Sequence, residues 1–513
     1  MASTEDGGRV ATRHSVAALI LGSAAVRLWL DARIGPSVDE SYAVVMSRRL
    51  ALSYYDHPPF LFWIPGLAAR LAGSEAPLVV RLPFVLMFMG TTWLLYRVAA
   101  LLFGKAAGLW SAVVLNLALF FSFSAAAWVL PDGPLLLASA AAALFLARAT
   151  IAPPPEERGR LVDWVGFGIC SGLGLLSKYH AAFLLLGMFA FLATSPRHRP
   201  LLKRPGPYVA VGLAVLLFLP VVVWNARNGW VSIRFQGGRA LPLPGERDTP
   251  LLDSILGQAT WILPWIWLPL LVVLASALRR GPRDAARWLL ACLGAGPVVF
   301  FTLVAALGRR GLPHWQAPGY FMLLPLLGSA VAARMERRDP WVGRWLWLST
   351  SGLALVLAAL VTHVSSGWIA HAAPSALERG DPTDDLLQWR PVVRQLRRWG
   401  YPRPDVPVVG ATWADAAKLA YALGPGTVVG SVGPDPRGFE YVESQASLLG
   451  RTLLLVARRR AGSVEPMVSY GPYFDRITPL GTIPIPRQEQ EGVTVSVYLA
   501  EHLLRPVPTA RRR

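Results

Sequence analysis

Eleven apolar stretches, each close to the length that crosses a lipid bilayer, dominate the first 363 residues of the chain. A helix that spans the hydrocarbon core needs about 20 predominantly apolar residues. We predict spans near residues 15–34, 77–98, 107–127, 134–150, 162–178, 180–194, 207–224, 258–278, 288–307, 317–333 and 345–363. Of the 513 residues, 54% are hydrophobic and only 16% are charged, whereas soluble chains contain roughly 25% charged residues. The sequence therefore predicts a polytopic α-helical membrane protein with about 11 transmembrane helices.

Basic residues mark one side of this predicted membrane domain. If the N-terminus is cytoplasmic, the tail and the inner loops hold most of the Lys and Arg, whereas the three short outer loops hold only Lys178, Arg309 and Arg310. The positive-inside rule then predicts a cytoplasmic N-terminus and an extracytoplasmic C-terminal region. Most of the formal net charge of +19 is thus a signal of topology, and we expect no nucleic-acid partner.

The chain divides into a tail over residues 1–14, a transmembrane domain over 15–363 and a C-terminal domain over 364–513. Two outer loops, 35–76 and 225–257, are long, and the first contains an amphipathic stretch over 41–55 that suits a helix in the membrane interface. After residue 364, predicted helices at 382–399 and 414–423 alternate with predicted strands at 406–409, 427–432, 452–456 and 493–498. We therefore expect a small outer α/β domain. Cys170 and Cys292 lie in apolar stretches, with no spacing typical of disulfides or of a metal site.

Ionisable residues gather on the predicted outer side of the membrane. They are Asp39, Glu40, Asp56, His57, Arg81, Asp132, Lys178, His180 and His314. Each has a structural alternative, because a carboxylate can cap a helix, a lysine can extend to the interface and a histidine can simply pack. Ionisable groups at membrane depth are costly, however, and are by default functional candidates. Their occurrence on one side favours a shared site.

Carboxylates beside Lys, Arg and His suit a reaction in which a base activates a hydroxyl and cations receive an anionic leaving group. A phosphate leaving group needs little protonation, so one base and several cations suffice. The sequence contains neither a Walker glycine loop nor a dinucleotide-binding glycine motif. This absence favours a donor that arrives within the membrane over a soluble nucleotide sugar.

Seven short motifs carry a family resemblance. They are Val38–Tyr42, Tyr54–Pro59, Arg81–Pro83, Pro131–Pro134, Leu176–Tyr179, Trp224–Trp230 and Leu312–Trp315. In this order they resemble the C-type-fold glycosyltransferases that use lipid-linked sugars. More narrowly, the chain is similar to glycosyltransferase family 39, the bacterial relatives of protein O-mannosyltransferase, and to the lipid A aminoarabinose and galacturonic acid transferases.

The resemblance implies an inverting enzyme of the bacterial cytoplasmic membrane that takes a sugar from a polyprenyl-phosphate donor. The acceptor would be an envelope lipid, glycan or protein, reached from the periplasmic face among membrane lipids. Asp39 matches the catalytic aspartate and is the expected general base, with Glu40 as its neighbour and Asp132 as the second acidic position.

The remaining site residues follow from the same resemblance. Lys178, Arg81 and His57 are the expected ligands of the donor phosphate. The expected substrate-binding residues are Tyr42, Tyr55, Asp56, Asn225 and His314. Some relatives bind a divalent metal ion and others need none; Asp56, His57 and His314 are the candidate ligands, and no other cofactor is expected.

Two other functions are compatible with a polytopic chain. A transporter or flippase of lipid-linked saccharides would have discontinuous helices, repeats and polar residues near the bilayer midplane, whereas here the polar residues lie in outer loops and no repeat is visible. An envelope assembly factor with a degenerate site is the third alternative, and activity measurements would exclude it.

Overall fold

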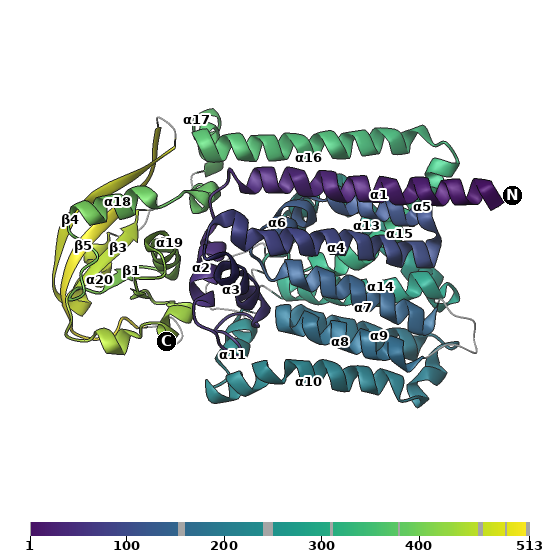
Figure 1. Cartoon of the computed structure of the whole chain (residues 1–513), viewed down its shortest axis with the longest axis horizontal. Helices are drawn as coiled ribbons and strands as arrows, with labels where there is room; N and C mark the ends of the chain where they lie inside the picture. Colours follow the sequence, from purple (N-terminus) through teal and green to yellow (C-terminus); the bar gives the residue numbers. More distant parts are fainter. Residues whose placement is uncertain are drawn as a thin grey trace. The chain divides into compact units, whose positions relative to one another are not determined.

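The computed structural model describes residues 2–151, 160–239, 250–307, 311–377, 380–459, 465–487 and 490–508. These residues form two compact units. The helical unit comprises Met1–Trp29, Ala51–Leu61 and Arg81–Ala354, and the mixed unit comprises Leu30–Leu50, Phe62–Val80 and Leu355–Arg513. Figure 1 labels the elements of both units.

Helices build the helical unit, and three of them, at Ala2–Asp31, Pro77–Phe103 and Pro340–Ser366, also contribute residues to the mixed unit. The helices are α1 (Ala2–Asp31), α4 (Pro77–Phe103), α5 (Lys105–Leu117), α6 (Ala125–Ala127), α7 (Asp132–Thr150), α8 (Leu161–Ser177), α9 (Ala182–Thr194), α10 (Gly206–Arg227), α11 (Val231–Gly238), α12 (Pro250–Ile262), α13 (Pro264–Arg280), α14 (Ala285–Ala306), α15 (Ala317–Glu336) and α16 (Pro340–Ser366). A π-helix at Phe120–Ser124 precedes α6, and a short 3-10 helix at Tyr179–Ala181 precedes α9. Every predicted span coincides with one of these helices or with a bent pair.

Five helices of the described chain are long and apolar enough to cross a membrane, or up to seven if each bent pair counts as one span. The bent pairs are α5 with α6, at 81°, and α12 with α13, at 107°. The second bend lies where Leu263 has a positive φ of 77° and Pro264 follows, because proline has no N–H to continue the helical ladder. The predicted number of eleven spans stays a prediction.

Small residues allow the helices to pack closely. A methyl group added at Gly168 on α8 would lie 2.5 Å from the Ala210 carbonyl on α10, and one at Gly328 on α15 would lie 2.6 Å from the Ala107 carbonyl on α5. Such close backbone approaches are typical of membrane helix interfaces. These glycines therefore determine which helices are neighbours.

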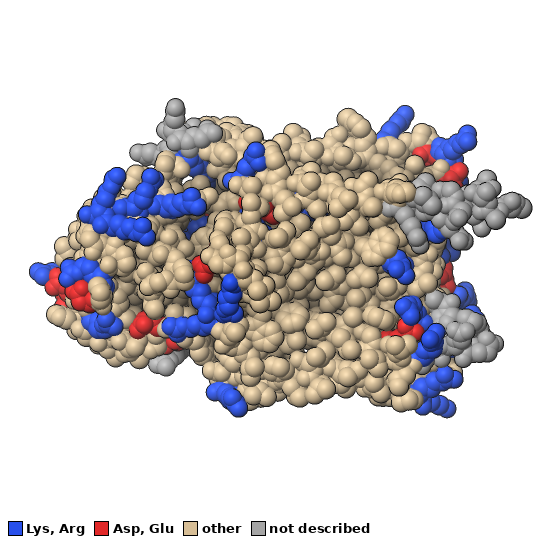
Figure 2. Space-filling view, viewed as in Figure 1, with Lys and Arg blue, Asp and Glu red and all other residues tan. Residues whose placement is uncertain are grey.

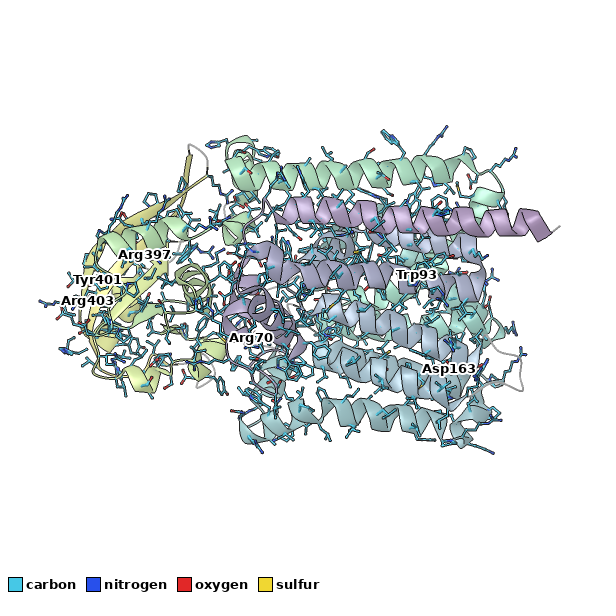
Figure 3. All side chains as sticks on the ribbon, in the orientation of Figure 1. Arg70, Trp93, Asp163, Arg397, Tyr401 and Arg403 are labelled. Atoms are coloured by element: carbon cyan, nitrogen blue, oxygen red, sulfur yellow. The ribbon has the colours of Figure 1, made fainter. Side chains whose placement is uncertain are left out.

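Charge is unevenly distributed over the helical unit. Figure 2 shows mostly uncharged side chains along the helices, with Lys and Arg gathered at the end where α1 begins. Asp163, labelled at this end in Figure 3, forms an ion pair of 3.0 Å with Arg148. An apolar band that ends in basic groups is typical of a membrane protein, whereas the predicted orientation stays a prediction.

The mixed unit contains a five-stranded sheet in the order β2-β1-β3-β5-β4. Its elements are α2 (Val38–Ser47), α3 (Phe60–Ala72), α17 (Trp368–Ala372), α18 (Arg390–Arg398), β1 (Val408–Gly410), α19 (Trp413–Leu423), β2 (Val429–Ser431), β3 (Leu453–Arg458), α20 (Pro466–Tyr470), β4 (Phe474–Arg487) and β5 (Gln490–Leu503). β1 pairs with β2 and β3 in parallel, whereas β5 pairs with β3 and β4 in antiparallel orientation. Thus the expected C-terminal α/β elements are present, and the predicted boundary at residue 364 stays a prediction.

Two sequence predictions for this unit differ from the structure, and one strand was not predicted. The helix predicted over 41–55 is α2, which begins earlier because Ser37 caps it and ends at Ser47. The helix predicted over 382–399 is divided into a 3-10 turn at Pro382–Leu386 and α18. β4 was not predicted because it contains prolines. The sheet tolerates these prolines because β4 is an edge strand.

Candidate active site

A buried ion pair joins two helix ends in the helical unit. Asp132 is the first residue of α7, and Lys178 follows the last residue of α8 in an extended conformation. The Lys178 Nζ lies 2.9 Å from Asp132 Oδ1 and 3.0 Å from Oδ2. The two side chains are only 5% and 3% exposed. The structure thus brings together two residues that the sequence separates by 46 positions.

His314 lies within electrostatic range of both members of this pair. Burial, followed by the charge of Lys178, lowers the pKa of His314 to about 4, and the charge of Asp132 opposes this shift. His314 is therefore neutral near pH 7, and its ring stacks on Phe120 with ring centroids 5.6 Å apart. Arg239 acts electrostatically on His314, and its guanidinium lies 5.3 Å from the centroid of Trp315.

Two members of this cluster were not assigned to the site from the sequence. Arg239 lies in the predicted outer loop 225–257, and only the abundance of arginine in that loop could have pointed to it. His180 stacks on Phe301 at 4.6 Å, and its Nε2 is buried without a hydrogen-bond partner among the described residues. Residues 240–249 of the same loop, and Arg309 and Arg310, lie outside the described residues.

Helix α11 holds the loop that carries Tyr55, Asp56 and His57. Ser232 Oγ donates a hydrogen bond of 2.6 Å to the Tyr54 carbonyl, and Gln236 Nε2 donates one to the Asp56 carbonyl. The rings of Tyr55 and Phe235 lie 5.1 Å apart. These contacts fix the backbone on both sides of Tyr55.

Asn225 positions α11 in turn. Its Oδ1 accepts a hydrogen bond of 3.1 Å from the Ser232 backbone N–H, and its Nδ2 donates one of 3.0 Å to the Val221 carbonyl. Asn225 is fully buried at the end of α10. The structure therefore gives Asn225 a positioning contact, while its predicted contact with substrate stays a prediction.

Arg81 is fully buried near the start of α4. A buried guanidinium in an apolar helix costs free energy, which makes Arg81 a functional candidate. Its predicted role as a donor-phosphate ligand stays a prediction, as does that of His57.

The two acidic residues expected at the catalytic position belong to the mixed unit, at the start of α2. Glu40 is fully buried, and its Oε2 accepts a hydrogen bond of 2.9 Å from the Ser37 backbone N–H. Ser37 Oγ accepts one of 3.2 Å from the Glu40 N–H, which completes a capping box. Asp39 is exposed. The local fold thus gives Glu40 a capping role and leaves Asp39 accessible.

Tyr42 lies one turn further along α2 and is buried. Its ring packs edge-on against Trp413 at 5.6 Å and Phe439 at 6.0 Å, and its Oη accepts a hydrogen bond of 3.1 Å from the Gly438 N–H. These contacts account for Tyr42 by packing within the mixed unit. Its predicted role in substrate binding stays a prediction.

The candidate metal ligands do not form a metal centre. Within the described parts of the chain, no group of three or more His, Cys, Asp or Glu side chains is arranged to hold a metal ion. The predicted set of Asp56, His57 and His314 therefore has no supporting geometry.

The fold and the buried site together define a class. The chain is a membrane protein with the ArnT-like C-type glycosyltransferase fold: several apolar helices and a C-terminal sheet domain. It superposes on the crystal structure of ArnT from Cupriavidus metallidurans with a TM-score of 0.59 and 16% sequence identity, covering 97% of this chain and 98% of that one. The crystal structure of the same ArnT bound to undecaprenyl phosphate also superposes with a TM-score of 0.59, at 17% sequence identity, covering 94% of this chain and 97% of that one.

Sequence comparisons give more specific relatives. Residues 56–224 match the family described as dolichyl-phosphate-mannose-protein mannosyltransferase. The chain is 26% identical, over 67% of its length, to the undecaprenyl phosphate-alpha-4-amino-4-deoxy-L-arabinose arabinosyl transferase of Pseudomonas paraeruginosa. It is 25% identical, over 63% of its length, to the lipid A galacturonosyltransferase RgtD of Rhizobium johnstonii. These matches span 65% and 66% of the two relatives. The resemblance predicted from the motifs is confirmed.

Proposed function

We propose that this protein is an inverting glycosyltransferase. It moves a sugar from a polyprenyl-phosphate donor to an envelope acceptor, which is lipid A or lipopolysaccharide, a polysaccharide or a protein, on the outer face of the cytoplasmic membrane. One observation carries the proposal: the buried Lys178–Asp132 pair with His314 and Arg239 beside it, in a chain with the ArnT fold. The names of the two relatives support the proposal, since one transferase is named for an undecaprenyl-phosphate sugar and the other for lipid A.

In the proposed reaction, Asp39 takes the proton of the acceptor hydroxyl. The acceptor oxygen attacks the anomeric carbon opposite the phosphate, the new glycosidic bond forms and the bond to the phosphate oxygen breaks. The configuration is therefore inverted, and polyprenyl phosphate leaves with the bonding electron pair. Because this leaving group is already a stable anion, no second carboxylic acid is needed to protonate it, in contrast to a glycosidase.

Cationic side chains would stabilise the charge that develops on the phosphate. Lys178 is the best placed of them, because Asp132 holds its ammonium in a single position. Arg81 and Arg239 would add fixed guanidinium charge, since arginine stays protonated even when it is buried. His314 is neutral and would contribute hydrogen bonding rather than charge.

Asp39→Asn tests the role of the base. The change keeps the size of the side chain at an exposed position, so the protein should fold while transfer from a radiolabelled polyprenyl-phosphate sugar is abolished. Glu40→Gln is the matched control, because glutamine also completes a capping box. Wild-type transfer by the Asp39→Asn variant would refute the assignment.

The same variants separate transfer from transport. A flippase would move a fluorescent lipid-linked saccharide across vesicles of reconstituted protein, and Asp39→Asn would leave that movement unchanged. If the wild-type protein moves the lipid but forms no glycosidic bond with any envelope fraction, the flippase alternative replaces the proposal.

Cysteine labelling tests the proposed membrane orientation. Single cysteines introduced at Pro200, in the basic turn before α10, and at Gly311, before α15, should react with an impermeant maleimide from opposite sides of the membrane. Reaction from the same side would contradict the proposed topology.

A further inference from the structure

A buried arginine lies inside the first helix of the helical unit. Arg27 is in α1, within the span predicted over 15–34, and is only 6% exposed. An ionisable side chain at this depth is costly and is by default a functional candidate. Extension to the membrane interface does not explain Arg27, because its guanidinium donates hydrogen bonds within the helical unit. The proposed reaction does not use this residue.

The contacts of Arg27 include two hydrogen bonds to the segment in which α5 gives way to α6. Its Nε donates one of 2.9 Å to the Ser122 carbonyl, and its Nη2 donates one of 2.8 Å to Asn116 Oδ1. Asn116 is held in turn, because its Nδ2 donates a bond of 2.9 Å to the Ala112 carbonyl. A guanidinium is planar and carries its N–H donors in a fixed fork. The two bonds therefore fix the position of one acceptor relative to the other.

These two acceptors lie on either side of a helix break. Asn116 is in the last turn of α5, and Ser122 is in the π-helix at Phe120–Ser124. Between them, Ala118 is extended, with a ψ of 119°. The segments on the two sides of the break meet at 81°. A side chain that bonds to both sides of such a break holds its angle, so Arg27 clamps the bend.

The clamped π-helix carries a ring that contacts the candidate site. Phe120 lies two residues before Ser122, and its ring stacks on His314 with centroids 5.6 Å apart and planes within 9°. His314 is the residue within electrostatic range of the buried ion pair. All of these residues belong to the helical unit. The bend therefore determines where the surface under the His314 ring lies, and π-helices occur frequently at functional sites.

We propose that Arg27 is a positioning residue of the active site. It holds the π-helix in its bend, and the π-helix presents the Phe120 ring as the surface on which His314 rests. In this role Arg27 does not touch the substrates. The clamp belongs to the fold of the helical unit, whereas its effect on sugar transfer rests on the function proposed above.

Hydrogen–deuterium exchange of the full-length protein in detergent tests the clamp without an activity assay. Arg27→Met removes both bonds and leaves an apolar side chain in an apolar helix. The backbone amides of residues 119–128 should then exchange at least about tenfold faster than in the wild type, because two hydrogen bonds that hold the segment closed are lost. Unchanged exchange in this segment would overturn the proposal.

Asn116→Leu reaches the clamp from its acceptor side. This variant removes the bond from Nη2 and leaves the other contacts of Arg27 untouched. Exchange in 119–128 should rise, by less than in Arg27→Met, because the bond to the Ser122 carbonyl remains. If the segment stays as protected as in the wild type, the bond to Asn116 holds nothing and the clamp is refuted.

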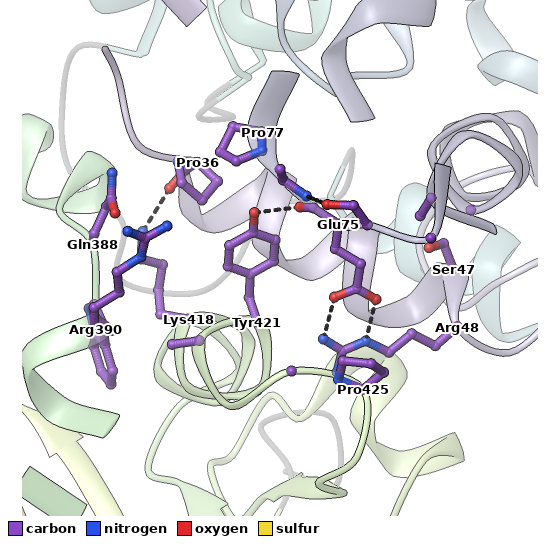
Figure 4. Close-up of a pocket in the computed structure, with 18 of the residues that line it drawn as sticks. Pro36, Ser47, Arg48, Glu75, Pro77, Gln388, Arg390, Lys418, Tyr421 and Pro425 are labelled. Carbon is purple, nitrogen blue, oxygen red and sulfur yellow. Dashed lines mark hydrogen bonds and ion pairs between the residues drawn. The ribbon is translucent and has the colours of Figure 1, made fainter. Parts of the chain in front are cut away.

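Arg48→Met is the matched control. Arg48 belongs to the mixed unit and also donates from Nε and Nη2, in bonds of 2.9 and 2.8 Å to the Glu75 carboxylate; Figure 4 draws both bonds as dashed lines. The variant loses a comparable arginine but keeps the clamp, so residues 119–128 should exchange as in the wild type. Faster exchange there would indicate a general loosening of the protein and overturn a specific clamp.

Transfer assays measure whether the clamp acts on the site. Arg27→Met should lower kcat about 10- to 100-fold and leave the apparent KM for the donor unchanged, because a misplaced group slows the reaction without weakening binding. A raised donor KM with an unchanged kcat would make Arg27 a binding contact and overturn its positioning role.

A double-mutant cycle tests the route through Phe120. Phe120→Leu removes the ring that stacks on His314 and should lower kcat by a similar factor. If Arg27 acts through this ring, Arg27→Met/Phe120→Leu should lose no more than the worse single variant, whereas losses that multiply would overturn the route. If the wild type transfers no sugar to any envelope fraction, the proposed function fails while the exchange result still decides the clamp.

Discussion

Lys178→Met removes the charge of Lys178 and keeps most of its length, so it tests what the buried pair with Asp132 does. Both carboxylate oxygens lie within 3.0 Å of the ammonium, and neither side chain is more than 5% exposed. The single variant leaves a carboxylate buried without its partner. The double variant Lys178→Met/Asp132→Leu removes both charges and fills the space with apolar atoms.

The geometry sets the expected magnitudes. At 2.9 Å and an effective dielectric constant of about 20, the gross attraction is about 6 kcal/mol. Desolvation of both ions offsets most of it, so breaking the pair by removing one partner should cost about 3–5 kcal/mol of unfolding free energy. Removing both charges should cost less than about 2 kcal/mol, because buried pairs are commonly replaceable by packed apolar residues.

Four proteins are compared: the wild type, each single variant and the double variant. Unfolding titrations in mixed detergent micelles measure stability, and transfer assays at varied donor concentration measure donor use. We expect the double variant to fold like the wild type and yet to lose about 100- to 1000-fold in transfer, because the phosphate has lost a preorganised donor. Stability and catalysis are thereby separated.

The Arg148–Asp163 pair, which lies at the basic end of the same unit, is the control. Arg148 is 47% exposed, so Arg148→Gln should cost less stability and leave transfer unchanged. A double variant that transfers sugar at the wild-type rate would show that Lys178 and Asp132 are purely structural. An equal rise in the apparent KM for donor and acceptor would also count against a phosphate ligand.

Two further predictions concern titratable groups outside the membrane-spanning segments. Because burial lowers the pKa of His314 to about 4, His314→Gln should reduce transfer without changing the shape of its profile between about pH 5.5 and 8; loss of a transition near pH 6.5 would contradict this. In the mixed unit, burial raises the pKa of Asp381, but hydrogen bonds from Thr383 and the charge of Arg487, 2.8 Å away, outweigh it and leave the pKa below its usual value. The stabilisation from Asp381 is therefore present above about pH 4 and lost as the pH falls further. Arg487→Met should remove it and cost about 3 kcal/mol at pH 7, whereas an unfolding midpoint equal to that of the wild type would disprove the role of this buried arginine.

The apolar stretches were predicted from the sequence because the constraint on them is local. A segment in hydrocarbon must satisfy its backbone hydrogen bonds within itself, so length and composition are enough to locate helices, and every predicted span coincides with a helix or with a bent pair of helices. The family resemblance was equally accessible, because its motifs lie in the chain in a fixed order.

The helix bend and the edge strand could not be predicted from local sequence patterns. The break at Leu263 depends on a positive φ, and β4 is tolerated despite its prolines only because it lies at the edge of the sheet. Both features depend on neighbours that local periodicity does not encode. The capping box at Ser37 and Glu40 is a local pattern, and it marks the start of α2.

The candidate site shows the same division. The sequence alone supplied the residue types, since ionisable groups in the loops of a membrane protein are rarely without purpose, and it gave Asp39, Asp132 and Lys178 as candidates. Only the tertiary structure decided that Lys178 pairs with Asp132, that Arg239 acts electrostatically on His314, and that Glu40 caps a helix. Hydrogen bonds and charges act over a few ångströms in space, and the packing of distant segments, which no local pattern specifies, determines which groups come within that range.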